Sequence, residues 1–266
     1  MALLPIYNYF CFNDQIRPVS EFIPSENEGG IYEVLRVVNG VPLFLEDHLS
    51  RFYKSAGLAG KTIPYSAAKI KAFLSLLIEK DKVDNGNVLI SCKTNLKAFF
   101  IAHKYPEISD YESGVVCGVL AAERKNPNAK VFQTSVRQQA NALIEKNGYY
   151  EVLLVDTNGF ITEGSRTNVF FIVEGKIITP TAQKVLLGIT RQKTMECAAH
   201  LGFEVEERNV KLDDLAAFDA LFLTGTSPKI LPVKSLGNFI FDPKNEVLQQ
   251  LIKKYNLLIN DYIKNA

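Results

Sequence analysis

Glu163 occupies a position in the sequence that calls for a chemical explanation. It precedes Val169–Ile172, an apolar run that is typical of a buried strand. A carboxylate close to a buried strand needs a partner, and a bound cation is the partner that would give Glu163 a function. The ordinary alternative is a turn residue that pairs with Arg166 or accepts a hydrogen bond from a backbone amide. The residues alone leave both interpretations open.

Two turns have the composition of an anion site. Gly188-Ile189-Thr190 begins a predicted helix, where backbone N–H groups and the positive end of the helix dipole favour a phosphate. Thr224-Gly225-Thr226-Ser227 follows a predicted strand and offers hydroxyls and amides. Singly, each is more simply a helix start or a polar turn, but together they favour a phosphate-bearing ligand. Neither a P-loop nor a Gly-x-Gly-x-x-Gly motif occurs in the sequence.

Lys130 closes a polar segment, residues 123–130, in which charged residues, Asn and Pro replace apolar ones. A lone lysine is usually a solvated surface residue. Its amine can also form a Schiff base, when the surrounding site lowers its pKa or captures it covalently. The sequence does not separate these two interpretations.

The elements that must position these groups fall on either side of this polar segment. Before it we expect an α+β unit with an antiparallel sheet. A hairpin at Asn39-Gly40 is expected over residues 31–45, followed by a helix at 47–60 capped by Asp47 and a second helix at 66–80. Three apolar segments, expected to be strands, follow at 87–92, 97–105 and 114–123. After it we expect helices at 135–148, 188–202 and 245–263. Strands are expected there at 149–156, 160–164, 169–179, 203–210 and 220–227.

Composition excludes several classes of function. The chain has 266 residues, is 47% hydrophobic and carries a net charge of +1, so we expect no nucleic-acid or membrane partner. Four scattered cysteines and three histidines, without a Cys-x-x-Cys pair, argue against a metal site. No export signal is recognisable at the start. We therefore expect a cytoplasmic protein with reduced thiols.

The spacing of residues around Glu163 matches a family. The chain reads Glu163-x-Ser-x-x-Asn-Val-Phe, then Ile177-x-Thr179, then Leu186-x-Gly188-Ile189-x-Arg191. This resembles the signature of the class IV aminotransferases, the fold-type IV pyridoxal-phosphate enzymes. Residues 32–52 and 222–233 are similar to further family motifs, so the resemblance extends over nearly the whole chain.

The resemblance implies a role for each candidate residue. Lys130 would be the Schiff-base lysine and proton shuttle, and Glu163 would pair with the pyridine nitrogen of pyridoxal 5′-phosphate. Asn168 would shape the turn that carries Glu163. The cofactor phosphate would be bound by Arg51, Ile189, Thr190 and Thr226, and the substrate by Tyr32 and Arg36. A salt bridge of Arg36 with Glu33 or another residue of the sheet is an alternative to the substrate role.

The family also implies an α+β fold of two domains, with residues 1–119 as the N-terminal domain, 120–129 as the linker and 130–266 as the cofactor domain. We expect a homodimer that transfers amino groups between an amino acid and a 2-oxo acid. Aminodeoxychorismate lyase, which eliminates pyruvate, and a non-catalytic protein of the same fold are alternatives. The segment that contains Lys93 lacks the Arg-Gly pair that the D-amino-acid and lyase members carry there. The tyrosine that binds the cofactor in the branched-chain members is also missing after Lys130. The sequence therefore specifies neither donor, acceptor nor stereochemistry.

Overall fold

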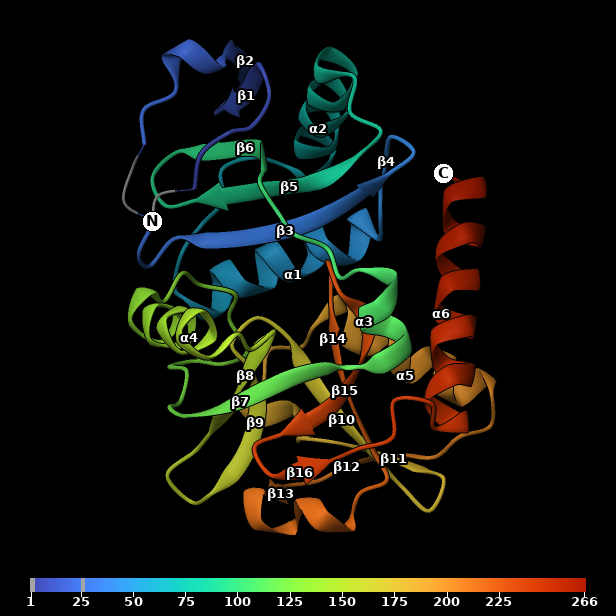
Figure 1. Ribbon diagram of the computed structural model, residues 1–266. Coiled ribbons are helices and arrows are strands. Elements are labelled where there is room, and N and C mark those ends of the chain that lie inside the picture. The colour runs from blue at the N-terminus through green and yellow to red at the C-terminus, as the bar shows by residue number, and fades with distance from the viewer. Residues whose placement is uncertain (1–2, 25–26) are drawn as a thin grey trace. The chain divides into compact units, whose positions relative to one another are not determined.

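The computed structural model describes residues 3–24 and 27–266 of the chain (Figure 1). Its contacts form two compact units, of which the first comprises Met1–Lys104, Ala129–Phe132 and Ile259–Ala266. The second comprises Tyr105–Asn128 and Gln133–Leu258. No helix in the described ranges is both long and apolar enough to cross a membrane.

The first unit is built on a six-stranded antiparallel sheet with the strand order β2-β1-β6-β5-β3-β4. The predicted hairpin at Asn39-Gly40 is confirmed, and both residues have the positive φ angles, 51° and 74°, that such a tight turn requires. The strands are β1 (Tyr9–Phe12), β2 (Gln15–Pro18), β3 (Ile31–Val38), β4 (Val41–Pro42), β5 (Asn85–Cys92) and β6 (Leu96–Ile101).

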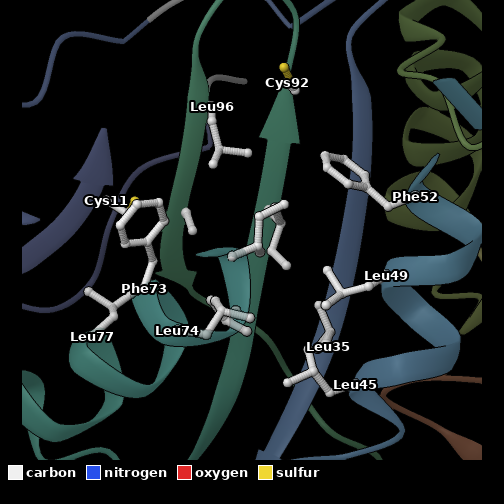
Figure 2. Packing of buried hydrophobic residues seen from close by; sticks show 14 of the residues in the cluster. Cys11, Leu35, Leu45, Leu49, Phe52, Phe73, Leu74, Leu77, Cys92 and Leu96 are labelled. Carbon is white, nitrogen blue, oxygen red and sulfur yellow. The ribbon is translucent and has the colours of Figure 1, made fainter. Parts of the chain in front are cut away.

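Two helices, α1 (Leu45–Leu58) and α2 (Ala67–Asp81), cover one face of this sheet. Ser66 caps α2 by accepting a hydrogen bond from the Lys69 amide. A 3₁₀ turn, η1 (Val19–Glu21), follows β2. The apolar side chains between helices and sheet form a continuous core, and Figure 2 shows among them Leu35, Leu45, Leu49, Phe52, Phe73, Leu74 and Leu77.

The start of α1 differs from the prediction. Phe44, in the left-handed conformation, is the N-cap, and Asp47 lies within the first turn. The Leu43 amide donates to the Arg36 carbonyl, which holds the chain in the hairpin up to the residue before the N-cap. Asp47 still lies in the first turn of α1, where the helix dipole stabilises a negative charge.

The second unit contains a mixed sheet in the order β12-β11-β10-β14-β15-β7-β8-β9-β13, with β16 paired to β15. β7 lies parallel to β8 and β15, and β11 lies parallel to β12. The strands are β7 (Val115–Ala121), β8 (Glu151–Val155), β9 (Phe160–Gly164), β10 (Asn168–Val173), β11 (Lys176–Thr179), β12 (Val205–Glu207), β13 (Val210–Lys211), β14 (Ala220–Gly225), β15 (Lys229–Leu236) and β16 (Phe239–Ile240).

The helices of the second unit are α3 (Ile108–Ser113), α4 (Thr134–Asn147), α5 (Ile189–His200) and most of α6 (Glu246–Lys264), with 3₁₀ turns η2 (Ala182–Lys184) and η3 (Leu212–Ala217). α5 packs against β14 and α4 against β8. The predicted strand 203–210 is divided into β12 and the start of β13, because β12 pairs with β11 whereas β13 pairs with β9.

Contacts group the chain differently from the boundaries expected from the sequence. Residues 105–119 join the second unit because β7 pairs with β8 and β15. Ala129–Phe132 joins the first unit because it pairs with the start of β3. The backbone between residues 122 and 130 has no helix or strand, as suits a linker. Lys130 therefore packs with the N-terminal part of the chain.

Candidate active site

Lys130 is fixed through its backbone. Its N–H donates to Ser55 Oγ on α1 at 3.0 Å, and its carbonyl accepts from the Tyr32 amide at 3.1 Å. The Phe132 amide donates to Gly30 at 2.9 Å, which continues the antiparallel pairing. The Lys130 Nζ lies 4.7 Å from the centre of the Tyr32 ring. A lysine held in this way is not a mobile residue of a solvated linker.

Tyr32 and Arg36 lie on the same face of β3, because side chains alternate along a strand. Tyr32 stacks on Phe132, with ring centres 3.9 Å apart, and packs with Leu89. Glu33 lies on the opposite face, toward α1. The alternative of an Arg36–Glu33 salt bridge is therefore wrong, since the Glu33 carboxylate pairs elsewhere.

Arg51 is held by a buried carboxylate. Its Nε donates to Glu33 Oε1 at 2.8 Å and its Nη2 to Glu33 Oε2 at 2.7 Å. His48 Nδ1 lies 2.8 Å from the same Oε2. Burial raises the pKa of Glu33, but Arg51 and His48 outweigh it and lower this pKa to about 2. Burial also lowers the pKa of His48, so the ring is neutral near pH 7.

A small pocket of about 140 Å³ opens beside Phe132 in the first unit. The described residues around it supply two ammonium groups, several amides and hydroxyls, and no carboxylate. They are Asn27, Gly30, Ser91, Lys93, Thr94, Asn95, Lys97 and Phe132. This composition suits a small anion.

Glu163 is the penultimate residue of β9 and is 4% exposed. Its Oε1 accepts from Arg124 Nη1 at 3.0 Å, and its Oε2 accepts from the Leu186 amide at 3.0 Å. Of the alternatives for Glu163, the hydrogen bond from a backbone amide is confirmed, since the Leu186 N–H donates to Oε2; Arg166 donates to Asn141. Arg124 was not recognised in the sequence, because nothing in the polar segment distinguishes it from its charged neighbours.

Asn168 joins the Glu163 turn to the start of α5. Its Nδ2 donates to the Leu186 carbonyl at 2.8 Å and lies 3.5 Å from Glu163 Oε2. Gly188 is the N-cap of α5, and a Cβ atom there would lie 2.1 Å from Asn168 Oδ1. Glycine therefore allows the amide to sit against the helix terminus. Ile189 and Thr190, both buried, follow in the first turn of α5.

Thr226 lies in the turn between β14 and β15. Thr224, at the end of β14, is directly opposite Asn168 in β10. The second unit therefore brings Glu163, the α5 terminus and the Thr226 turn to one end of its sheet. The first unit brings Tyr32, Arg51 and Lys130 together around Glu33 and Ser55. No group of His, Cys, Asp or Glu suited to a metal occurs in the part of the chain that the structure describes.

The chain is similar to known proteins in both sequence and fold. Residues 30–236 match the family described as amino-transferase class IV. A probable branched-chain-amino-acid aminotransferase of Rickettsia felis is 30% identical over 254 residues, 88% of this chain and 87% of that protein. A D-alanine aminotransferase of Bacillus licheniformis is 28% identical over 228 residues, 78% of each chain.

The same fold is found in a solved structure, the branched-chain amino acid aminotransferase of Thermobaculum terrenum in its PLP form. It superimposes with a TM-score of 0.83 at 22% identity, over 96% of this chain and 95% of that one. The predicted α+β class and the predicted family are confirmed by these matches.

Proposed function

The chain belongs to the class IV aminotransferases, and we propose that the residues described above carry out the pyridoxal-phosphate-dependent transamination of that family. One observation supports the proposal most. A buried carboxylate, Glu163, and a glycine-capped helix terminus, at Gly188, share one end of a sheet and are joined by Asn168. A phosphorylated pyridine needs these two partners, because its ring nitrogen is cationic when protonated and its phosphate is anionic.

The residues fit the cofactor through their chemistry. Ile189 and Thr190 offer first-turn amides and a hydroxyl to the phosphate, Thr226 adds a second hydroxyl, and Arg51 adds a guanidinium. Glu163 would keep a proton on the pyridine nitrogen. Arg124, Asn168 and the Leu186 amide hold its carboxylate in one orientation.

When bound, the cofactor supplies an electron sink that makes the Cα–H bond of an amino acid acidic. Lys130 Nζ would hold the cofactor covalently. When free, this amine would act as the base that removes the proton from the substrate Cα and as the acid that returns a proton to complete the transfer. The fixed backbone of Lys130 sets the point from which its flexible side chain reaches the cofactor.

The substrate side is proposed to include Tyr32 and Arg36. Arg36 presents a guanidinium that can bind a carboxylate with two parallel hydrogen bonds. The pocket beside Phe132, with Lys93 and Lys97, adds a second cationic region. An acidic substrate, such as glutamate or 2-oxoglutarate, is therefore favoured over an apolar amino acid and its apolar 2-oxo acid.

This preference is tested by steady-state kinetics of Arg36→Lys and Lys93→Gln. Arg36→Lys keeps the charge but loses the planar fork, so KM should rise for 2-oxoglutarate and change less for an apolar amino donor. Equal losses on both substrates would assign Arg36 to the stability of the sheet. Unchanged kinetics of Lys93→Gln on the acidic substrate would remove the pocket from the substrate site.

The reaction itself is tested with purified protein reconstituted with pyridoxal 5′-phosphate. A screen of D- and L-amino acids with 2-oxo acids should give amino transfer, and Lys130→Ala should abolish both activity and borohydride-fixed attachment of the cofactor. Lys125→Ala, in the same polar segment, is the matched control and should retain both. Attachment lost in the control and kept in Lys130→Ala would refute the assignment.

The alternatives give different results in the same assay. Release of pyruvate from aminodeoxychorismate without an acceptor would indicate the lyase, and no reaction with any amine would indicate a non-catalytic protein. The names of the two curated relatives favour transamination. Homodimer formation remains a proposal and is tested by light scattering. A cytoplasmic location is likewise proposed, supported by four free, buried cysteines.

A further inference from the structure

Three buried polar side chains lie between β3 and α1. Glu33 is fully buried, and His48 and Arg51 are 3% and 8% exposed. His48 and Arg51 are three residues apart on α1, so they lie on the same face of the helix. Both contact the carboxylate of Glu33. Nothing in the transamination chemistry derived above uses Glu33 or His48.

The Glu33 carboxylate determines the direction of the Arg51 guanidinium. It accepts from Nε and from Nη2, which together define one edge of a planar group. With this edge bound, the plane and the opposite edge of the guanidinium are fixed in space. A free arginine loses rotamer entropy on binding a ligand, and this pairing removes part of that loss beforehand.

His48 in turn fixes Glu33. The neutral ring donates through only one nitrogen, and Nδ1 is the nitrogen that lies 2.8 Å from Glu33 Oε2. Nδ1 therefore carries the hydrogen. Because Oε2 also accepts from Arg51 Nη2, the histidine prevents the carboxylate from turning away from the guanidinium.

We propose that Glu33 and His48 are positioning residues that hold Arg51 in the orientation needed to bind the cofactor phosphate. This inference rests on the proposed function, in which Arg51 is a phosphate ligand. His48 acts only through Glu33 and Arg51. Its removal should therefore weaken binding of the phosphate and leave binding of the pyridine ring unchanged.

The test compares two ligands of the full-length apoprotein, pyridoxal 5′-phosphate and pyridoxal, which lacks the phosphate. Dissociation constants are measured by equilibrium dialysis for the wild type, Arg51→Ala, His48→Leu and the double variant. Arg51→Ala should weaken the phosphorylated ligand by about 10- to 100-fold, as for loss of a charge-assisted hydrogen bond. His48→Leu should weaken it by about fivefold, and pyridoxal should bind all four proteins alike.

Two further variants separate positioning from a loss of fold. His48→Asn places an amide N–H near the position of Nδ1 and should restore most of the affinity that His48→Leu loses. His200→Leu replaces an exposed histidine at the end of α5 and should leave both dissociation constants unchanged. The double variant should bind no more weakly than Arg51→Ala, because His48 has no separate route to the phosphate.

The outcomes distinguish the inference from the proposed function. If Arg51→Ala binds both ligands like the wild type, the phosphate role of Arg51 is wrong. If Arg51→Ala is selective but His48→Leu binds like the wild type, only the positioning inference is overturned. The positioning inference is also overturned if His48→Leu weakens binding of both ligands equally, or if the effects of His48→Leu and Arg51→Ala add in the double variant. It is likewise overturned if His48→Asn folds but does not restore affinity.

Discussion

Gly188→Ala tests the packing of the helix terminus against Asn168. Gly188 has φ −62° and ψ 138°, angles that alanine adopts without strain. The new Cβ would lie 2.1 Å from Asn168 Oδ1, far inside van der Waals contact. Any effect of the substitution therefore comes from this contact rather than from the backbone.

The size of the effect follows from what Asn168 must give up. To accommodate the methyl group, its amide has to rotate away from the Leu186 carbonyl, which it now bonds at 2.8 Å, and from Glu163 at 3.5 Å. Leaving a buried carbonyl without its donor costs about 1–3 kcal/mol. We expect Gly188→Ala to lower the free energy of unfolding by about 2 kcal/mol. Affinity for pyridoxal 5′-phosphate should also fall, because Asn168 would no longer hold the Glu163 turn against the start of α5.

A double-mutant cycle measures the contact directly. Urea unfolding of the apoprotein is recorded for the wild type, Gly188→Ala, Asn168→Ala and the double variant. Once the asparagine is truncated the clash is gone, so the double variant should be about as stable as Asn168→Ala alone. The resulting interaction free energy should be about 2 kcal/mol.

Gly57→Ala is the matched control. Gly57 lies in α1, and a Cβ there meets nothing within 4 Å. Alanine should raise the free energy of unfolding by about 0.5–1 kcal/mol, because it has the better helix propensity. Additive effects of Gly188→Ala and Asn168→Ala, or a Gly188→Ala protein as stable as the wild type, would refute the reasoning.

Three further predictions concern single residues. Glu163→Gln should keep the cofactor bound but lower kcat, by about tenfold for each unit by which the pKa of the pyridine nitrogen falls. An unchanged kcat would show that Glu163 has only a structural role. Burial lowers the pKa of His48 below its ordinary 6.5, so the unfolded chain binds the proton more tightly than the folded chain. The urea midpoint of unfolding should therefore fall as the pH drops below 6.5. It should fall less in His48→Asn, which has no titrating group at this position. Ser55→Ala should slow borohydride-detected attachment at Lys130, whereas Ser66→Ala, which removes only the α2 cap, should lower stability without this effect.

Local sequence determined the elements whose chemistry is complete within a few residues. Asn39-Gly40 predicts its hairpin because both residues tolerate positive φ, and Ser66 stands where α2 begins. Asp47 misled the prediction of a helix start, because the hairpin contact from Leu43 to Arg36 decides where the helix begins. That contact belongs to the sheet and cannot be read from the helix sequence.

The candidate site divides in the same way. Glu163, Gly188 and Ile189 stand within one short signature, so the sequence is sufficient to single them out. Arg124 lies 39 residues before Glu163, and its pairing depends on how the strands between them return to one end of the sheet. The residue types in the polar segment do not predict this pairing, because any of its positively charged residues could have reached the Glu163 carboxylate.

Lys130 shows the limit most clearly. Its sequence register relative to Glu163 identifies it as the candidate amine and groups it with the residues that follow. The fold attaches its backbone instead to Ser55, 75 residues earlier, and to the start of β3. The sequence determined which residue types are available for the chemistry and where they stand in the chain. Only the tertiary structure decided which partners orient them, because hydrogen bonds between distant segments depend on the path of the whole chain.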